Sequence, residues 1–401
     1  MQRRILIAHE REIVKLHFDD EGFDGQLQRS VGKCDAGMAN VGECLYVASR
    51  IAAGDRDSWH AEWSAFADRL VAQAAIADRA GHGVSAASRR VRAAEYYRQA
   101  FFWHRDNLDG KEFTTAYRAS VDAFRMALPD LPRPGRIVEG DTPGYLFAPV
   151  GAGPFPTILH IGGYDSTAEE LYASVYPALD RGWAFVGLDG PGQGSVLYDR
   201  RVPQRPDWEN VVPGMFDLVA RLPEVDGKRI VLVGRSFGGV LAPRGAAGAP
   251  RLAGLIVDPG QYDMGAGLSA RLGPLWAHID DPAFKPQFDA LLDKPSMRTL
   301  LGPRMVTNGA SDPQAYFRDM RRYTAAALAP SIECPSFVTD NETDAVSTGQ
   351  GQMLYDAMTC PKTFRRFMRD EGAEGHCEGM APVVFWTAAF DWLDETVRRA
   401  P

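Results

Sequence analysis

One serine lies in a sequence context that can make it a nucleophile. Ser236 is the centre of Gly234-Arg-Ser-Phe-Gly238, and the apolar run Ile230–Val233 precedes it. A G-x-S-x-G turn between a strand and a helix exposes the serine hydroxyl, because its two glycines allow a cramped turn. Small residues between Val240 and Ala247 favour the helix that should follow. Since 40 of the 401 residues are glycine, the strand–turn–helix context predicts the nucleophile better than the pentapeptide does.

A serine nucleophile needs a base to take its proton, and the base needs an acid to orient it. His376 is the histidine that follows the last expected strand, and its glycine-rich loop can reach across the strand ends. Two acids, Asp340 and Asp344, follow the strand expected at Ser336–Thr339. We favour Asp344, because a carboxylate within a loop can turn toward the histidine, whereas Asp340 would still belong to the strand.

Backbone amides near the serine can stabilise the negative charge of an attacked carbonyl oxygen. The amide of Phe237, directly after the serine, is the first candidate. The second should come from the loop after the strand Pro156–Ile161, where Gly163 or Tyr164 can offer an N–H group. Asp189–Gly194 is also rich in glycine, but it lacks the lysine and the spacing of a phosphate-binding loop, so we predict a tight turn there.

The elements that would hold these residues alternate between strands and helices. This β-α-β alternation predicts an α/β fold with a doubly wound, mostly parallel sheet. A hairpin is expected before it, and a helix at 383–397 closes the chain. The expected strands of the sheet are 156–161, 183–188, 230–233, 252–257, 334–339 and 363–368.

Two regions stand outside this alternation. Residues 1–130 are predicted to form a helical N-terminal domain, although residues 1–35 show no periodic pattern and are expected to be irregular. Residues 263–330 contain amphipathic segments directly after a core strand, so we predict a helical cap over the strand ends. The α/β core is then divided between residues 131–262 and 331–401.

Aromatic side chains are frequent on the N-terminal helices, and two of them, Trp63 and Tyr97, are candidate substrate-binding residues. If the N-terminal helices and the cap meet over Ser236, these rings would line a closed apolar pocket between domains. The alternative is that they only form the core of the helical domain.

Length and composition limit the classes of function. A chain of 401 residues exceeds one α/β core, and roughly 100 residues or more of accessory structure are expected. Hydrophobic residues make up 45% and charged residues 24% of the chain, as in soluble globular proteins. The net charge of −8 and the lack of a basic run argue against binding to nucleic acids or anionic membranes. We therefore expect a small-molecule substrate.

The sequence also predicts a cytoplasmic protein. Its N-terminal apolar stretch ends after four residues, which is too short for a signal peptide. No apolar run approaches the ~18 residues of a transmembrane helix. The five cysteines are scattered and are expected to be reduced thiols. No cluster has metal-ligand spacing, so neither a metal nor another cofactor is expected.

Several of these motifs resemble one group of α/β-hydrolases. The group contains 2,6-dihydroxypseudooxynicotine hydrolase, fungal hydrolases that shorten polyketide chains, and the fermentation-respiration switch proteins. The resemblance lies in Gly162-Gly-Tyr-Asp-Ser-Thr-Ala-Glu-Glu170, Gly234-Arg-Ser-Phe-Gly-Gly239, the Asp340–Asp344 loop and Glu374-Gly-His-Cys377. The N-terminal helices are similar too, so the resemblance covers most of the chain.

The resemblance implies the α/β-hydrolase fold, a helical N-terminal domain, a cap and a homodimer. Residue matching makes Ser236, Asp344 and His376 the catalytic triad. Characterised members cleave a carbon–carbon bond beside a ketone that an electron-rich ring carries. They also place an acidic residue near the start of the cap. The nearest here are Asp258 and Asp263, of which Asp263 is a candidate substrate-binding residue; neither matches the pattern, so ester and thioester substrates stay open.

We therefore expect a cofactor-free serine hydrolase that acts through an acyl-enzyme on a hydrophobic aromatic or polyketide-like molecule. Cleavage of a carbon–carbon bond beside a ketone is one outcome of this chemistry, and a carboxylesterase or thioesterase is the alternative. A non-catalytic regulatory protein with the same fold is a third interpretation, which the resemblance to switch proteins allows. A complete triad argues against it, because a binding protein does not need all three side chains.

Overall fold

The computed structural model describes residues 14–397, so the N-terminal stretch considered above as a signal peptide lies outside the described residues. Its centre is an eight-stranded sheet with the order β1-β2-β4-β3-β5-β6-β7-β8. β1 and β2 are antiparallel to their neighbours and the other strands are parallel, as the sequence predicted. The strands are β1 (Gly135–Val138), β2 (Gly144–Phe147), β3 (Phe155–Ile161), β4 (Ala184–Leu188), β5 (Val225–Arg235), β6 (Gly254–Asp258), β7 (Ser336–Asn341) and β8 (Lys362–Phe367).

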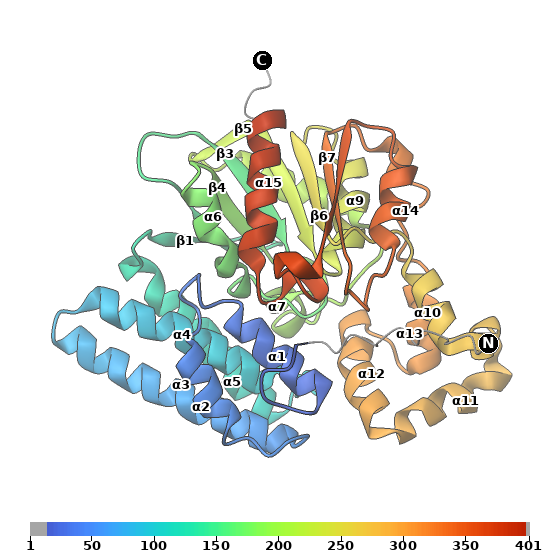
Figure 1. Cartoon of the computed structure of the whole chain (residues 1–401), viewed down its shortest axis with the longest axis horizontal. Coiled ribbons are helices and arrows are strands. Elements are labelled where there is room, and N and C mark those ends of the chain that lie inside the picture. The colour runs from blue at the N-terminus through green and yellow to red at the C-terminus, as the bar shows by residue number, and fades with distance from the viewer. Residues whose placement is uncertain (1–13, 398–401) are drawn as a thin grey trace, which may run out of the picture.

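Helices cover both faces of the sheet, and α15 crosses one face in Figure 1. One face carries α6 (Val175–Leu179) and α15 (Pro382–Thr396), and the other carries α8 (Val212–Ala220), α9 (Gly238–Gly248) and α14 (Gln350–Ala357). Along β5, Val231 and Val233 join the first core, whereas Leu232 joins the second. Burial on both faces explains why the central strands are continuous apolar runs.

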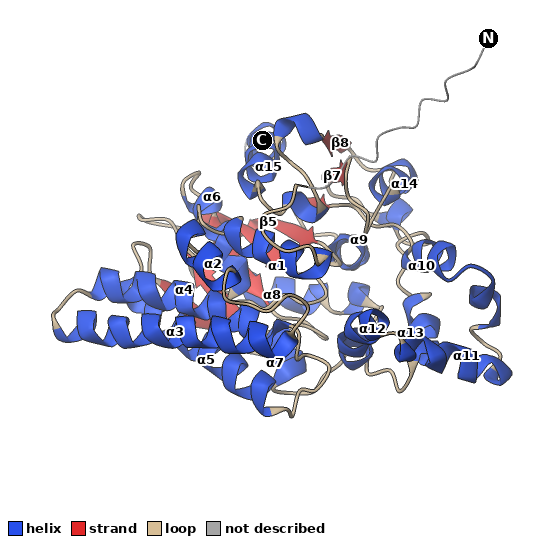
Figure 2. Ribbon diagram, turned by 60° about the horizontal axis from the view of Figure 1, so that its bottom comes forward, coloured by secondary structure: helices blue, strands red, loops and turns tan. Residues whose placement is uncertain are grey.

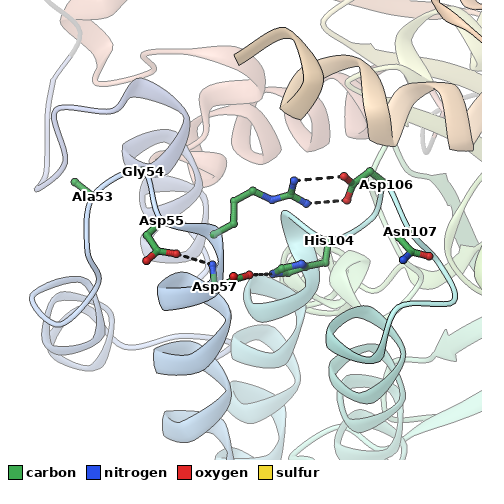
Figure 3. Close-up of a pocket in the computed structure, with 8 residues that line it drawn as sticks. Ala53, Gly54, Asp55, Asp57, His104, Asp106 and Asn107 are labelled. Atoms are coloured by element: carbon green, nitrogen blue, oxygen red, sulfur yellow. Dashed lines mark hydrogen bonds and ion pairs between the residues drawn. The ribbon is translucent and has the colours of Figure 1, made fainter. Parts of the chain in front are cut away.

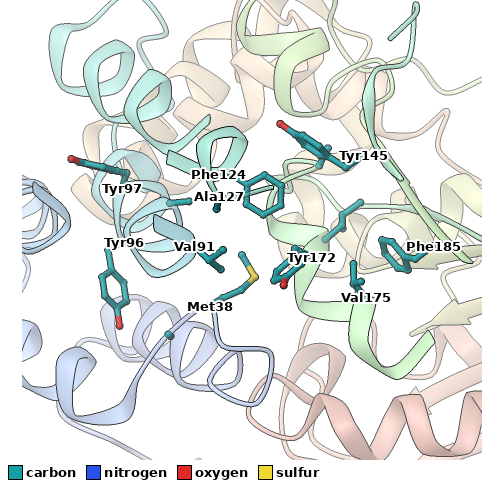
Figure 4. Packing of buried hydrophobic residues seen from close by; sticks show 14 of the residues in the cluster. Met38, Val91, Tyr96, Tyr97, Phe124, Ala127, Tyr145, Tyr172, Val175 and Phe185 are labelled. Carbon is teal, nitrogen blue, oxygen red and sulfur yellow. The ribbon is translucent and has the colours of Figure 1, made fainter. Parts of the chain in front are cut away.

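The N-terminal helices extend the first of these cores (Figures 1 and 2). The Phe124 ring lies 4.9 Å from the Tyr145 ring of β2 and 5.5 Å from the Tyr172 ring. Figure 4 shows these rings between the helices and the sheet. The helices are α1 (Glu21–Val31), α2 (Val41–Ala48), α3 (Arg56–Arg79), α4 (Gly83–Phe102) and α5 (Lys111–Ala127), and the short α7 (Gly194–Tyr198) packs against them.

Helix α1 corrects the expectation that residues 1–35 are irregular. The Asp20 side chain caps the helix by accepting a hydrogen bond from the amide of Phe23. Its buried face combines the apolar Phe23 and Leu27 with the polar Asp24 and Ser30. Hydrophobic periodicity cannot detect a helix whose buried face is half polar.

Residues 263–330 form the predicted helical layer, with no strand among them. Figure 1 shows these helices at the lower right, below the sheet, and the N-terminal helices at the lower left. The cap helices are α10 (Met264–Leu272), α11 (Lys285–Asp289), α12 (Pro295–Asn308) and α13 (Pro313–Met320). Short 3-10 turns lie between α10 and α11 and between α11 and α12. We refer to this layer as the cap; the exact division of the chain into domains stays a prediction.

Two kinds of feature are absent from residues 14–397. No helix there is both long and apolar enough to cross a membrane. Within the same residues, no group of three or more His, Cys, Asp and Glu side chains is arranged to hold a metal ion.

Candidate active site

Ser236 lies on a sharp turn between β5 and α9. Its φ is +58°, in the left-handed region that non-glycine residues seldom adopt. Its amide donates a 2.8 Å hydrogen bond to the carbonyl of Asp258. A Cβ atom on Gly234 would lie 2.3 Å from the carbonyl oxygen of Gly238, so the turn requires glycine there. The predicted strand–turn–helix is therefore confirmed.

His376 connects Ser236 to Asp344. Its Nε2 lies 2.8 Å from Ser236 Oγ, and its Nδ1 lies 2.9 Å from Asp344 Oδ2. The other oxygen of Asp344 accepts a 2.7 Å hydrogen bond from the amide of Val346. Asp340 is on strand β7 and its carboxylate accepts a hydrogen bond from its neighbour Asn341. The structure thus brings Ser236, His376 and Asp344 together, and it leaves Asp340 on the strand.

The positive charge of His376 and the negative charge of Asp344 stabilise one another. Burial alone would lower the pKa of His376, but Cys377 and the Asp344 carboxylate outweigh burial and raise that pKa well above its ordinary value. Burial opposes ionisation of Asp344, yet the hydrogen bonds from His376 and from backbone amides bring its pKa below the ordinary value. Asp344 is therefore suited to stabilise a positive charge on the imidazole.

A buried charged network holds the His376 loop on the strand ends. Arg235 donates a 2.7 Å hydrogen bond to Asp258 and another hydrogen bond to the carbonyl of Cys377. Asn341 donates a 3.0 Å hydrogen bond to Glu378. Burial and the nearby Asp258 raise the pKa of Glu378 well above its ordinary value. Sequence reasoning missed this network, because its members come from three separate strand ends.

The glycine loop after β3 approaches Ser236 closely. A Cβ atom on Gly163 would lie 2.6 Å from the Cβ of Ser236. The amide of Gly163 already donates a 3.0 Å hydrogen bond to Ser166 Oγ. The amides of Tyr164 and Phe237 have no acceptor among the described residues. Of the two alternatives on this loop, Tyr164 is therefore the one with a free donor.

Gln193 supports the same loop from the next strand end. Its Nε2 donates a 2.7 Å hydrogen bond to the carbonyl of Gly162, and its Oε1 accepts one of 3.0 Å from the amide of Gly190. The tight turn predicted at Asp189–Gly194 is present. The hydrogen bond from Gln193 to Gly162 was not predicted, because a glutamine in a turn does not show which residue it will bond to.

A cavity of about 1170 Å³ opens above Ser236. Ser236 and His376 lie in its wall together with residues from both helical layers. The apolar contributions include Phe23, Phe102 and Trp103 from the N-terminal helices and Met264, Leu268 and Phe317 from the cap. These apolar side chains share the wall with many polar and charged ones, among them six arginines, so the cavity suits a small molecule that has both apolar and polar parts.

Residues 146–385 match the sequence pattern of the alpha/beta hydrolase family. The chain belongs to this family. It is 31% identical to the 20-hydroxy-prefusarin hydrolase FUS2 of Gibberella moniliformis, over 94% of this chain and 97% of that protein. It is 29% identical to the hydrolase LUC6 of a Fusarium species, over 95% of this chain and 98% of the relative.

The crystal structure of 2,6-dihydroxy-pseudo-oxynicotine hydrolase shares the fold of this α/β-hydrolase. The TM-score is 0.71, with 21% sequence identity, and the match covers 91% of this chain and 95% of the other. The resemblance inferred from the sequence motifs is therefore confirmed, and the chain is an enzyme of a family whose named relatives are hydrolases.

The two aromatic residues proposed for substrate binding do not line the cavity of the hydrolase. Trp63 is fully buried in the helical layer, where its ring lies 5.1 Å from that of Tyr96. The Tyr97 hydroxyl donates a 2.5 Å hydrogen bond to Asp68. The N-terminal aromatic surface does reach the cavity, but through Phe102 and Trp103 at the end of α4. Helical spacing identifies an apolar face, not the helix end that meets another layer.

The two acids near the start of the cap have different surroundings. Asp258 is fully buried and paired with Arg235. Asp263 lines the cavity and caps α10, where its Oδ1 accepts a 3.1 Å hydrogen bond from the amide of Ala266. Only Asp263 is therefore placed to meet a substrate.

A second, polar hollow of about 730 Å³ adjoins the cavity, with Gly54 and Arg56 in both walls (Figure 3). Arg56 forms a 2.7 Å ion pair with Asp106 in it. A Cβ atom on Gly302 of α12 would lie 3.0 Å from that of Asp106. The cap and the N-terminal helices thus touch at this ion pair.

The end of α1 packs against the His376 loop. A Cβ atom on Gly32 would lie only 1.9 Å from the carbonyl oxygen of Gly379. Residue 32 must therefore be glycine for the first helix to sit beside the loop that carries the histidine.

Proposed function

We propose that this α/β-hydrolase is a serine hydrolase that forms an acyl-enzyme on Ser236. The observation that carries the proposal is the pair of hydrogen bonds made by His376, at 2.8 Å to Ser236 and 2.9 Å to Asp344. His376 takes the hydroxyl proton as Ser236 Oγ bonds to the substrate carbonyl carbon. Asp344 holds the ring in the productive tautomer and stabilises its positive charge.

The carbonyl oxygen becomes an oxyanion in this step. The free amides of Phe237 and Tyr164 are proposed to stabilise it, in place of Gly163, whose amide is engaged. When the intermediate collapses, His376 gives its proton to the leaving group. It then removes a proton from water, whose oxygen attacks the acyl carbon and releases the acid with Ser236 restored.

The substrate is proposed to be hydrophobic, either aromatic or polyketide-like, because apolar side chains from both helical layers enclose Ser236. For a carbon–carbon bond beside a ketone, the leaving carbanion must be protonated or delocalised. Asp263 is the acidic side chain at the start of the cap that lines the cavity. We therefore propose Asp263 for this step, with a carboxylester or thioester as the alternative substrate.

The test of the nucleophile is the Ser236→Ala variant, assayed with an activated ester and labelled with a fluorophosphonate. Turnover is expected to fall by about 10⁴-fold to 10⁶-fold, and labelling should disappear. Ser331→Ala, at an exposed serine far along the chain, serves as the control and should retain both. Asp344→Asn should lower turnover by about 10⁴-fold, far more than Asp340→Asn. If the Ser236→Ala variant is still labelled, or the wild type is never labelled, the proposal fails and a binding role gains support.

The bond that is cleaved can be tested with an aryl 1,3-diketone and a matched aryl ester. If Asp263 assists a carbanion leaving group, Asp263→Asn should lower the ratio of diketone to ester turnover by about tenfold or more, as expected for loss of a general acid. An unchanged ratio, or a wild type that cleaves only the ester, would favour the esterase.

A further inference from the structure

The arginines in the cavity wall fall into two groups. Two of them, Arg271 and Arg304, have no carboxylate within 4.0 Å among residues 14–397, and both belong to the cap. The other four are ion-paired: Arg29 and Arg105 with Asp165, Arg56 with Asp106, and Arg235 with Asp258. Within the described part of the chain, the cavity arginines without a counter-charge thus belong to the cap.

On α10, the arginine ends an apolar stripe. Met264, Gly267, Leu268 and Arg271 line the cavity, at the i, i+3, i+4, i+7 spacing of one helix face. One Nη of Arg271 donates a 2.7 Å hydrogen bond to the carbonyl of Ala345. A guanidinium has five N–H donors in all, so most of them stay available.

Helix α12 repeats the pattern. Met297, Leu300, Leu301 and Arg304 line the cavity at the same spacing. Arg304 donates a 2.9 Å hydrogen bond to the carbonyl of Leu300, one turn earlier in its own helix. The two helices therefore each present a methionine, a leucine and then an arginine to the cavity.

Both arginines lie close to Tyr316, and Arg304 also lies close to the serine turn. Burial raises the pKa of Tyr316, and the positive charges of Arg304 and Arg271 both oppose that rise. The guanidinium of Arg304 lies 5.9 Å from the ring centre of Tyr164. The Tyr164 ring in turn lies 4.6 Å from that of Phe237, the residue after the serine. About one tyrosine side chain thus separates Arg304 from the serine turn.

We propose that Arg271 and Arg304 form a subsite for an acidic oxygen group of the substrate, a carboxylate or an ionised phenol or enol. This inference rests on the proposed hydrolase function and adds a charge to its hydrophobic substrate. A guanidinium binds such oxygens through paired, charge-assisted hydrogen bonds. The apolar part of the substrate lies along the methionine and leucine stripes, while its carbonyl group reaches Ser236.

The experiment compares matched esters in the full-length enzyme. One is the p-nitrophenyl monoester of suberic acid, with a free carboxylate, and its neutral partner carries a methyl ester at that end. A third ester ends in a 2,6-difluorophenol, which ionises near neutral pH, and its partner ends in the methyl ether. Values of kcat/KM are measured for each pair in the wild type, Arg304→Gln, Arg271→Gln and the double variant.

The wild type is expected to prefer the charged member of at least one pair, and the pair preferred identifies the acidic group as carboxylate or phenolate. Loss of a charge-assisted hydrogen bond should lower the charged-to-neutral ratio by roughly tenfold to a hundredfold in Arg304→Gln. Arg304→Lys, which keeps the charge, should recover part of the ratio. Added salt should also reduce the wild-type preference, because it screens partly exposed charges.

Arg298→Gln is the matched control, since Arg298 belongs to α12 and is exposed outside the cavity wall. It should leave the ratio at the wild-type value. A wild-type ratio that Arg304→Gln and the double variant do not change would overturn the subsite. Ser236-dependent turnover of the neutral esters would show in that case that the hydrolase proposal still holds, whereas its absence for all esters would remove both.

Discussion

The two helical layers that line the cavity place their charged side chains differently. On the N-terminal side, Arg98 and Lys33 are buried and both pair with Glu170 from the α/β core, at 3.1 and 2.7 Å. On the cap side, Arg271 and Arg304 have no carboxylate partner among residues 14–397. Charge is therefore used on one side to fix a helical layer to the sheet, and on the other side it faces the cavity.

The N-terminal layer and the cap also differ in how tightly they pack. Helix α4 is 20 residues long and buries most of its side chains. In the cap, α10 buries only Gly265, and α11, α12 and α13 each have a proline near their first residue. We infer that the N-terminal layer is tightly packed, whereas the cavity face of α10 in the cap can change at little cost in stability; α13, by contrast, buries Tyr316, Phe317 and Met320.

The largest effect on stability is expected from breaking the ion pairs that hold the N-terminal layer on the α/β core. Arg98→Met removes one of the buried cations around Glu170, where Arg29 and Lys33 remain, and loss of one partner from a buried ion-pair network should lower the free energy of unfolding by about 3–5 kcal/mol. Arg304→Met in the cap should change it by less than about 1 kcal/mol. Urea denaturation of both variants measures the difference. Similar losses of stability in the two variants would contradict this difference between the N-terminal layer and the cap.

Acid should also weaken the ion pairs between the N-terminal layer and the α/β core. Burial opposes ionisation of Glu170, but Arg29, Arg98 and Lys33 outweigh it and lower its pKa to about 2. The same kind of contact lowers the pKa of Asp165. A carboxylate with a depressed pKa stabilises the fold above its ordinary pKa, and this contribution is lost as pH falls toward the folded value.

Unfolding free energy should therefore decline between about pH 4.5, the ordinary range of a glutamate, and pH 2. The loss should be smaller in Glu170→Gln, which has already lost one of these carboxylates. Denaturation at a series of pH values checks this, and an identical slope for wild type and variant would count against the role of Glu170.

A smaller effect on catalysis separates the cavity wall from the helical core. Trp103→Ala removes a ring that lines the cavity, so kcat/KM for a naphthyl ester should fall about tenfold more than for p-nitrophenyl acetate, as for a lost apolar contact. Trp63→Ala removes a ring from the helical core, so thermal stability should fall and the two activities should decline in parallel. Equal activity ratios in the two variants would remove Trp103 from the substrate site.

The smallest effect on stability is expected from substitutions in the cap. Leu268→Ala, on the cavity face of α10, should cost less than about 1 kcal/mol of stability, because this side chain is only partly buried. Leu70→Ala in α3 should cost about 2–5 kcal/mol, because that leucine is 4% exposed. Thermal or urea denaturation of both variants is sufficient to test this. A larger loss of stability at Leu268 would show that α10 is as tightly packed as the N-terminal layer.

Local patterns in the sequence predicted most of the fold. The β-α-β order, the serine turn and the helical insertion after β6 follow from composition and short-range periodicity. Asp344 could be preferred over Asp340 because only a loop residue can reach a histidine from another strand. The proximity of Ser236, Asp344 and His376 was thus predictable, and their catalytic roles stay a proposal.

Long-range polar contacts could not be predicted in this way. Arg29 of α1 pairs with Asp165 and Glu170, which lie far along the chain in a loop of the core. No local pattern links residues so far apart. For the same reason, the N-terminal aromatics could be assigned to a buried face, but the end of α4 that meets the cavity could not be chosen.

The contact between Gly32 and Gly379 joins the first described helix to the last loop before the closing helix. During synthesis the ribosome delivers the N-terminal part first. The surface on which the His376 loop rests is therefore made long before the loop itself. A truncated chain that ends before residue 376 lacks the histidine, and a chain that lacks α1 leaves the loop without its support. The site that combines Ser236 with His376 therefore depends on two segments that lie far apart along the chain, the first described helix and the last loop before α15.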